Sequence, residues 1–545
     1  MTATAGATAD RIGRWGWTAT AVAVAALVVV PVATLAVSIA QPQGDLWRQQ
    51  WATRLPGQIG STLGLVAGVG ALSIALGVGL AWLVSAYDFP GRRTLGWALV
   101  LPLAVPGYIL GFVTTSAIGE AGPLQTWWRD RFGVDAWFPD VRSLPVAAVV
   151  LALTLYPYVY LLARAALRDQ AGGAYFVARS LGASSASAVR RVVLPLLRPA
   201  VAAGVAVVVM ETLTDIGTVQ YFGVETISVG VFRIWRGTFD RDAASELATL
   251  VLAFALLAIG SERILRGRAR FGEAGGRAAG LARRRLRGGG AAAATVGAAV
   301  VVALGFAAPA FQLAVWAVGE QSGPRGTPNL RRFGEFLGNS LTLTLTTVAV
   351  CLVLSILVTN ARRFGNGRTA GWANRLTAAG YAVPGPVVAM GVILVLVGVD
   401  QALGSIDLGL PGVVATGSFL ALVYAYAVRF LAPGLTAVES GLGQIPDEMT
   451  ASARSLGARP RRILGRIHLP LSRASVLTAA VLVGVDALKE LPVALLLRPI
   501  GFDTLPVWVY NLASESRFEQ AALPALTIIG VALVPVALLT RRLDR

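Results

Sequence analysis

The sequence predicts an all-α membrane protein built from two parallel repeats of six transmembrane helices. Apolar side chains make up 55% of the 545 residues and charged ones 14%, and the mean hydropathy is +0.67. These values lie outside the range of soluble globular proteins. Apolar runs of about 20 residues recur, each long enough to cross a hydrocarbon core as a helix. Between them neither a strand period nor an amphipathic helical period is found, which argues against a soluble protein with a large core.

About twelve spans are expected, in two sets of six. The first span follows Arg11 and Arg14, as in a signal peptide. Its apolar run of about 23 residues is longer than a signal core, so we expect it to remain uncleaved. Pro106 and Pro384 are expected to kink the third span of each half. We place the spans near 17–39, 60–86, 94–117, 144–166, 199–218, 244–262, 292–318, 340–360, 373–399, 412–436, 474–497 and 521–540.

The charged and metal-binding residues narrow the class further. With the N-terminus inside, most arginines fall in cytoplasmic segments or at their edges, so both termini are expected in the cytoplasm. The net charge of +18 is then explained by topology, and no nucleic-acid partner is expected. Cys351 and His468 are the single cysteine and histidine, too few ligands for a disulfide framework or a haem, zinc or copper pathway. We expect no metal site, no catalytic residue and no cofactor in this chain.

An internal duplication divides the chain. We expect a first half at 1–262, a linker at 263–290 and a second half at 291–545. Because each half has an even number of spans, both halves share one orientation. The linker is rich in Gly, Ala and Arg and carries nine arginines; we interpret it as a cytoplasmic tether, with binding of anionic lipid headgroups as the alternative. The matching segments are Ala104–Gly107 with Ala382–Gly385, Tyr156–Leu167 with Tyr424–Leu435, and Phe222–Phe232 with Ile500–Tyr510.

The most distinctive repeated segment is polar. ARSLGASSASAVRRVVLP (Ala178–Pro195) is matched by ARSLGARPRRILGRIHLP (Ala453–Pro470). Both are expected on the cytoplasmic side between the fourth and fifth spans, as a short helix, a flexible and closely approached glycine, and a new helix that begins at the proline. The repetition indicates that both present one surface to the same kind of partner; the alternative is a duplication without a shared contact.

This pattern resembles the EAA loop of permeases in binding-protein-dependent ABC importers. The resemblance implies a type I importer fold in which each loop is a coupling helix that fits a cleft on an ATPase subunit. Phe176 and Ala451 stand where the family has its glutamate, and Val177 and Ser452 where it has the next alanine; Glu448 lies one turn upstream. The implied coupling residues are Arg179, Ser180, Leu181, Gly182, Ala183, Leu194, Pro195, Arg454, Ser455, Leu456, Gly457, Ala458, Leu469 and Pro470.

The resemblance extends over nearly the whole chain. Glu211–Trp235 and Lys489–Glu515 look like the fused, double-length permeases of ferric-iron importers. This implies iron import across a bacterial inner membrane, with two copies of a cytoplasmic ATPase subunit that hold the ATP and Mg²⁺, and an extracytoplasmic binding protein. Permeases for thiamine, polyamines and aminoethylphosphonate share much of the pattern and remain alternatives.

The chain is not expected to be the ATPase itself. A phosphate-binding loop needs a lysine after a glycine-rich stretch, and the single lysine, Lys489, has no such stretch before it. A twelve-span carrier driven by an ion gradient is the competing hypothesis from another class. A gradient-driven carrier has no need for the paired cytoplasmic loop, which therefore favours the importer. A third hypothesis, a structural membrane scaffold, leaves the charges within the spans unexplained.

The fifth span of each half carries charge. Glu211 and Asp215 are four residues apart, as are Asp486 and Glu490, with Lys489 beside them. Each pair is expected on one helical face. A carboxylate at the bilayer centre costs about 2.5–3.5 kcal/mol, so these groups must face a partner or water. Two interpretations stay open: the carboxylates line the passage and attract a cation, or they pair with Lys489 and nearby arginines to fix the helices at a gate.

Overall fold

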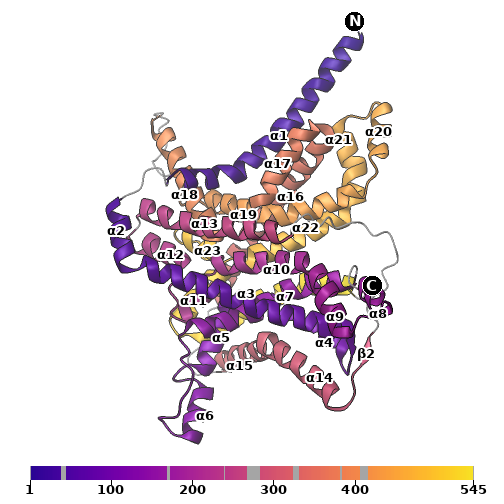
Figure 1. Cartoon of the computed structure of the whole chain (residues 1–545). Coiled ribbons are helices and arrows are strands. Elements are labelled where there is room, and N and C mark those ends of the chain that lie inside the picture. The colour runs from indigo at the N-terminus through magenta and orange to yellow at the C-terminus, as the bar shows by residue number, and fades with distance from the viewer. Residues whose placement is uncertain are drawn as a thin grey trace. The chain divides into compact units, whose positions relative to one another are not determined.

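The computed structural model describes residues 2–38, 44–168, 172–238, 240–266, 283–322, 330–380, 383–405 and 415–543, and they are overwhelmingly helical (Figure 1). Contacts group the chain into two compact units. Unit 1 comprises Met1–Gly44, Val231–Thr249 and Leu330–Val507. Unit 2 comprises Asp45–Gly230, Leu250–Asn329 and Trp508–Arg545. Each unit therefore combines segments from both sequence halves. The domain boundaries expected at residues 262 and 290 describe the sequence repeat and stay a prediction. Most of the expected linker, residues 267–282, lies outside the described residues.

The expected all-α membrane architecture is confirmed. Eleven helices among the described residues are long and apolar enough to span a membrane. A twelfth span arises if the pair Arg92–Ala104 and Gly107–Phe132, bent by 94°, counts as one. The eleven are Arg14–Ser38, Leu55–Ala86, Leu144–Ala166, Ser185–Thr214, Arg241–Ile264, Gly288–Gly319, Leu330–Phe364, Gly385–Gly404, Phe419–Gly443, Pro460–Lys489 and Phe518–Ala537.

The elements up to the linker follow one another with short connections. They are α1 (Thr2–Ser38), α2 (Gly44–Thr53), α3 (Leu55–Ala86), β1 (Tyr87–Asp88), α4 (Arg92–Ala98), the 3₁₀ turn η1 (Leu101–Ala104), α5 (Gly107–Ile118), α6 (Pro123–Phe132), α7 (Leu144–Ala166), α8 (Gly172–Ser180), α9 (Ser185–Ala188), the π-helical turn η3 (Val189–Val193), α10 (Leu194–Thr214), α11 (Gly217–Tyr221), α12 (Ile227–Thr238) and α13 (Arg241–Arg266).

The elements after the linker repeat much of this order. They are β2 (Arg284–Arg285), α14 (Gly288–Val302), the π-helical turn η4 (Ala303–Ala307), α15 (Ala308–Ser322), α16 (Leu330–Phe364), α17 (Gly367–Ala379), α18 (Gly385–Ser405), α19 (Phe419–Gly443), α20 (Asp447–Ser455), α21 (Pro460–Ile463), the π-helical turn η6 (Leu464–His468), α22 (Leu469–Lys489), α23 (Pro492–Leu497), α24 (Leu505–Ser514) and α25 (Phe518–Leu543).

The first helix of each sequence half packs in the unit dominated by the other half. In unit 1, α1 runs alongside α17 (Figure 1), where Ala21 and Ala25 share a buried cluster with Ala361 and other alanines of α16 and α17. In unit 2, α15 packs on α5 and α25, and the Trp316 ring stacks on Phe518 at 5.9 Å. Small residues allow this close approach of helices. Close packing matters here because the hydrophobic effect does not drive helices together within lipid.

The prolines of the third spans stand directly before a new helix. Val105 is extended (φ −96°, ψ 110°) and Pro106 precedes the first residue of α5, since a proline disfavours the helical conformation of the residue before it. Pro384 likewise stands directly before α18. The expected kink is confirmed at Pro106, since Arg92–Ala104 and Gly107–Phe132 are bent by 94° at the break that contains this proline. Residues 381 and 382 lie outside the described residues, so the kink at Pro384 stays a prediction.

The prolines of the polar loops lie inside a continuous span. Residues Ser185–Thr214 and Pro460–Lys489 each form one span. The helices therefore begin at Ser185 and Pro460, and the expected starts at Pro195 and Pro470 are wrong. In each span a π-helical turn, η3 or η6, ends two residues before the proline. The wider i→i+5 turn accommodates a residue that lacks an N–H and would clash with the carbonyl four residues back.

Candidate coupling loops and the charged ends of the fifth spans

Both polar loops end their short helix with the same backbone motif. In the first, the N–H of Ala183 donates to the carbonyl of Ala178 at 3.0 Å, and that of Gly182 to Arg179 at 3.1 Å. In the second, Ala458 donates to Ala453 at 3.0 Å and Gly457 to Arg454 at 2.9 Å. This pair of bonds is the Schellman motif, which requires a left-handed residue at its turn.

The two glycines supply that left-handed residue. Gly182 and Gly457 have φ of +86° and +79°, which glycine adopts without strain. An added Cβ would meet nothing within 4 Å at either position. Within this chain the glycines are therefore needed for backbone direction, and a close approach of a partner at these positions stays a prediction. The repeated ARSLGA is the last turn of a helix together with its stop signal, rather than the beginning of one.

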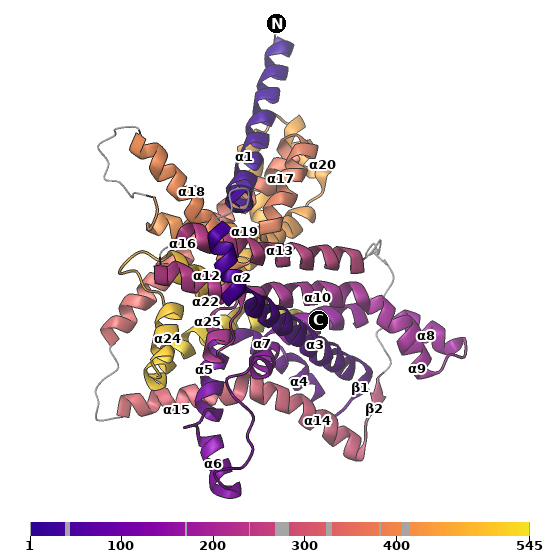
Figure 2. The same cartoon turned by 60° about the vertical axis from the view of Figure 1, so that its left-hand side comes forward.

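The turn exposes one leucine in each loop. Leu181 is 82% exposed and Leu456 87%. Exposed apolar residues of α8 and α20 extend this surface, namely Phe176 and Val177 in the first loop and Met449 in the second. In Figure 2, α8 and α9 lie together beyond the end of α10. Large exposed apolar side chains on a short helix indicate a protein-binding surface, and the sequence analysis did not single out Met449.

The other members of the expected coupling set have local roles. Arg179 donates to the carbonyl of Ala183 at 2.7 Å, so it reinforces its own turn. Ser180 and Ser455 bond back to carbonyls three residues earlier. Leu194, Pro195, Leu469 and Pro470 lie in the spans that follow the loops.

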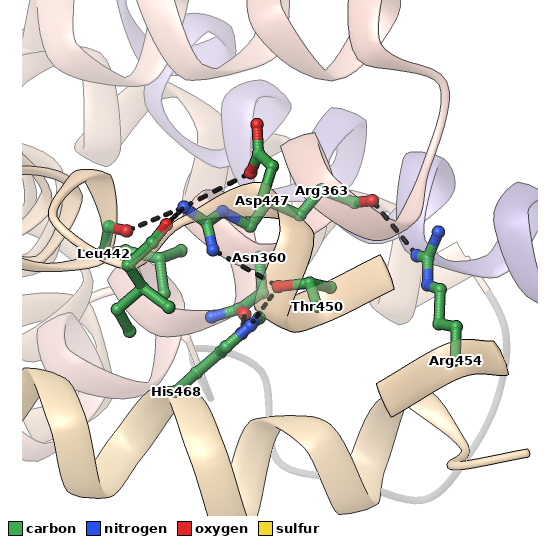
Figure 3. A network of polar contacts seen from close by, with 8 residues as sticks. Asn360, Arg363, Leu442, Asp447, Thr450, Arg454 and His468 are labelled. Atoms are coloured by element: carbon green, nitrogen blue, oxygen red, sulfur yellow. Dashed lines mark hydrogen bonds and ion pairs between the residues drawn. The ribbon is translucent and has the colours of Figure 1, made fainter. Parts of the chain in front are cut away.

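The second loop is fastened to the membrane helices by a polar network (Figure 3). The Arg363 guanidinium, at the end of α16, donates to the carbonyls of Leu442 and Ile445 at 2.8 and 2.7 Å, and to the Thr450 hydroxyl of α20 at 3.4 Å. It also faces the Asp447 carboxylate at 3.5 Å. One arginine therefore links the end of α16 to the end of α19 and to α20.

His468 completes the network from the start of the fifth span. Its Nδ1 lies 2.6 Å from Asn360 Oδ1 and its Nε2 lies 3.0 Å from Thr450 Oγ1. Because Asn360 Nδ2 donates to the Ile356 carbonyl, its Oδ1 is the acceptor. This assigns the proton to Nδ1 and makes Nε2 the acceptor for the Thr450 hydroxyl. The imidazole is 1% exposed, so both of its nitrogens are satisfied in a buried place.

Arg454 contacts this network from the end of α20. Its Nη2 donates to the carbonyl of Arg363 at 3.1 Å, and its guanidinium lies 5.1 Å from the Phe364 ring centroid. The His468 ring stacks on the same phenylalanine at 5.5 Å and 15°. Thr450 and Arg454 of α20 thus face the membrane helices of this chain. Met449 of α20 and Leu456 of the following turn are exposed.

The first loop has no equivalent side chains at these positions. Backbone bonds that repeat in both halves give the register: Ile227 N donates to Thr62 Oγ1, and Leu505 N donates to Ser340 Oγ. By this register and that of the two loops, Asn360, Thr450 and His468 correspond to Trp82, Tyr175 and Val193. Tyr175 reaches only the neighbouring turn, with its hydroxyl 3.0 Å from Ser185 Oγ. The two loops therefore share their outward turn and differ in how they are attached.

The carboxylates of the fifth spans do not form two helical pairs. The helix α10 ends at Thr214 and α22 at Lys489, so Asp215 and Glu490 have extended ψ angles of 128° and 121°. The helices were expected to continue to 218 and 497. Asp215 and Glu490 instead lie two residues before the next short helix and accept from its first turn: Asp215 accepts from Val219 N at 3.1 Å, and Glu490 accepts from Val493 N at 3.1 Å. Such side-chain acceptance satisfies a helix N-terminus, and it explains why the long helix stops there.

Glu490 has a buried cationic partner that the sequence analysis missed. Arg429, in the middle of α19, places Nε 3.1 Å from Glu490 Oε2, with side-chain exposures of 7% and 6%. Tyr426 also donates to the Glu490 carbonyl at 3.3 Å. A lone arginine inside the apolar run Phe419–Gly443 was the available signal, because a charge within a span needs a partner.

Lys489 pairs with Asp486. Their charged atoms lie 2.9 Å apart, and their side chains are 25% and 24% exposed. Glu211 is partly buried in α10. Within the part of the chain that is described, no three His, Cys, Asp or Glu side chains are grouped so that they could hold a metal ion.

Comparison with known proteins identifies the family. The model described as "Binding-protein-dependent transport system inner membrane component" matches residues 51–265 and again 352–545. The chain belongs to this family. The double match confirms the internal repeat and the recognition of a double-length permease. It also sets the gradient-driven carrier and the structural scaffold aside, since the family consists of ABC importer permeases, which are transport components and not enzymes.

Relatives of this permease carry different substrate names. The Fe(3+)-transport system permease protein FbpB 2 of Haemophilus influenzae is 24% identical over 496 residues, 90% of either chain. The sulfate transport system permease protein CysT of Escherichia coli is 28% identical over 248 residues, 44% of this chain and 86% of the relative. The molybdenum transport system permease protein ModB of Escherichia coli is 25% identical over 193 residues, 34% and 82% of the two chains.

Proposed function

We propose that this permease imports ferric iron, delivered by an extracytoplasmic binding protein, and that its two loops bind two copies of a cytoplasmic ATPase subunit. The observation that carries the proposal is the pair of Schellman turns, which present Leu181 and Leu456 in the same backbone context. One polypeptide then supplies both docking sites. Both termini lie on the cytoplasmic side in this arrangement, because the loops and the arginine-rich segments share that side.

The iron assignment is supported by coverage. The relative named for Fe(3+) matches 90% of the double-length chain, whereas CysT and ModB match 44% and 34% of it. An oxyanion such as sulfate or molybdate is the second candidate, favoured by those two relatives. The acidic residues Asp486 and Glu490 are paired with cations, so we propose that they shape the gate and do not hold the substrate. A trivalent ion bound by several buried carboxylates would leave too slowly for conduction.

Reconstitution tests the substrate and the assembly together. The permease, its ATPase subunit and its binding protein are placed in proteoliposomes, and ATP hydrolysis and uptake are measured with ferric ion, sulfate or molybdate in turn. Ferric ion alone should stimulate both. Stimulation by sulfate or molybdate without ferric ion would reject iron. Native mass spectrometry should show one permease with two ATPase subunits, and two permease chains in the complex would reject the proposed assembly.

Two single variants test the docking surface. Leu181→Asp and Leu456→Asp should each weaken ATPase binding, because each puts a charge into the apolar contact. Val134→Asp is the matched control, since Val134 is 80% exposed but lies on the segment between α6 and α7, on the opposite side of the expected membrane. ATPase binding that survives both leucine variants, or that falls equally in the control, would contradict the proposed contact.

A further inference from the structure

Arginines gather where three spans of unit 2 begin or end. Helix α3 ends at Ala86, α7 ends at Ala166 and α14 begins at Gly288. Eight described arginines belong to these ends and to the segments next to them: Arg92, Arg93, Arg164, Arg168, Arg283, Arg284, Arg285 and Arg287. The carboxylate that the structure places among them is Asp88. The cluster is thus strongly positive and lies at one membrane face.

Backbone pairing holds the segment after the linker in place. The strands β1 and β2 pair in parallel, with Tyr87 opposite Arg284 and Asp88 opposite Arg285. Leu286 N donates to the Asp88 carbonyl at 2.9 Å, and Thr295 Oγ1 of α14 donates to the Pro90 carbonyl at 2.9 Å. These backbone bonds therefore fix the exposed arginines of β2 beside the end of α3.

The neighbouring arginines are oriented by carbonyls and by Asp88. Arg92 Nε lies 3.2 Å from Asp88 Oδ1, and its Nη1 donates to the Val84 carbonyl. Arg164 Nη1 donates to the Gly96 carbonyl at 2.8 Å. Burial lowers the pKa of the Arg283 guanidinium, and the positive charges of Arg92 and Arg164 lower it further. The positive charges of the described arginines in this cluster therefore outnumber the negative charge of Asp88.

The N-terminus of α14 adds uncapped donors to this surface. Its N-cap residue Arg287 makes no side-chain capping bond, and the first turn is Gly288–Gly290. A Cβ at any of these glycines would meet nothing within 4 Å, so the backbone N–H groups are open to a ligand. Helix N-termini attract anions through these donors and the helix dipole, which adds to the charge of the arginines around it.

We propose that this arginine cluster binds the phosphate of an anionic glycerophospholipid headgroup. Guanidinium groups bind phosphate through two parallel hydrogen bonds. The site lies where three spans end, which is the level of the headgroups. A bound phosphodiester relieves the repulsion among the arginines and would brace β2 and α14 against α3.

Native mass spectrometry of the full chain, released from nanodiscs of phosphatidylcholine with phosphatidylglycerol, tests this site. The wild type should retain phosphatidylglycerol. Arg284→Gln with Arg285→Gln should weaken retention about 30-fold, from about fivefold for each arginine at a membrane surface. Arg368→Gln with Arg375→Gln, which removes two exposed arginines of α17, is the matched control and should retain the lipid.

The remaining outcomes each decide the question. Failure of the wild type to retain phosphatidylglycerol, or equal loss in both double variants, would overturn the proposal. Thermal stabilisation by inorganic phosphate as strong as that by phosphatidylglycerol vesicles would identify a free anion and reject the lipid. Lipid retention that is unchanged in the Arg284 and Arg285 variant, together with loss of the ATPase subunit, would assign the cluster to a protein partner instead.

Discussion

The buried pair Arg429–Glu490 should contribute far more stability than the neighbouring pair Lys489–Asp486. Both pairs lie at the end of α22 and have similar charge separations of 3.1 and 2.9 Å. They differ in exposure, about 7% and 6% against about 25% and 24%. Removing one partner of a buried ion pair leaves an uncompensated charge and costs about 3–5 kcal/mol. Removing one partner of a more exposed pair costs about 1 kcal/mol or less.

Arg429→Met should therefore lower the free energy of unfolding by about 3–5 kcal/mol, and Lys489→Met by about 1 kcal/mol or less. Both are measured by denaturant titration in mixed micelles. Adding Glu490→Gln to Arg429→Met should recover much of the loss, since the amide oxygen still accepts from Val493 N but carries no charge. Asp486→Asn should rescue Lys489→Met, whereas Glu490→Gln should not.

The decisive result is which variant, Arg429→Met or Lys489→Met, lowers the free energy of unfolding more. If Lys489→Met destabilises the protein as much as Arg429→Met, burial does not set the strength of these pairs and the argument fails. Failure of Glu490→Gln to restore the Arg429→Met variant would show that Arg429 stabilises the protein through contacts other than Glu490. Uptake measured on the same variants separates a loss of stability from a loss of conduction.

Two further results are expected. Gly457→Ala should lower the free energy of unfolding by about 1 kcal/mol, because the left-handed turn is strained for any residue with a Cβ. The control Gly443→Ala, at an open position without positive φ, should be neutral. Equal melting temperatures of the two variants would contradict the role of the left-handed turn. His468→Phe should keep the stack on Phe364 but leave Asn360 and Thr450 without their partner, at a cost of about 1–3 kcal/mol, and should raise ATP hydrolysis relative to transport; unchanged coupling would reject the role of the network.

The spans and the repeat could be predicted because long apolar runs dominate the composition and local sequence identity marks the duplicated loops. Details that depend on distant partners could not. The Arg429–Glu490 pair joins residues far apart in sequence, and Glu490 faces Arg429 only because α22 stops at Lys489. The displaced helix start before Pro195 depends on a π-helical turn, for which no residue pattern is specific.

The unequal attachment of the loops was also beyond prediction. The sequence repeats ARSLGA faithfully, yet Asn360, Arg363 and His468, which attach the second loop, come from α16 and η6 and lie outside that motif. Asn360 and His468 are separated by 108 residues and meet at 2.6 Å. A single histidine was interpreted only as too few ligands for a metal, and its polar surroundings became visible once the helices were placed.

The placement of α1 in unit 1 has a consequence for biogenesis. The ribosome makes α1 first, but its packing partners α16, α17 and α18 begin only at Leu330. Until then the helix waits in the bilayer without its alanine contacts, shielded only by lipid or by the insertion machinery. In unit 2, α15 packs on α5, which is made before it, and on α25, the last helix made. Each unit therefore needs helices from both ends of the synthesis, and a fused chain keeps each early helix tethered to the late ones.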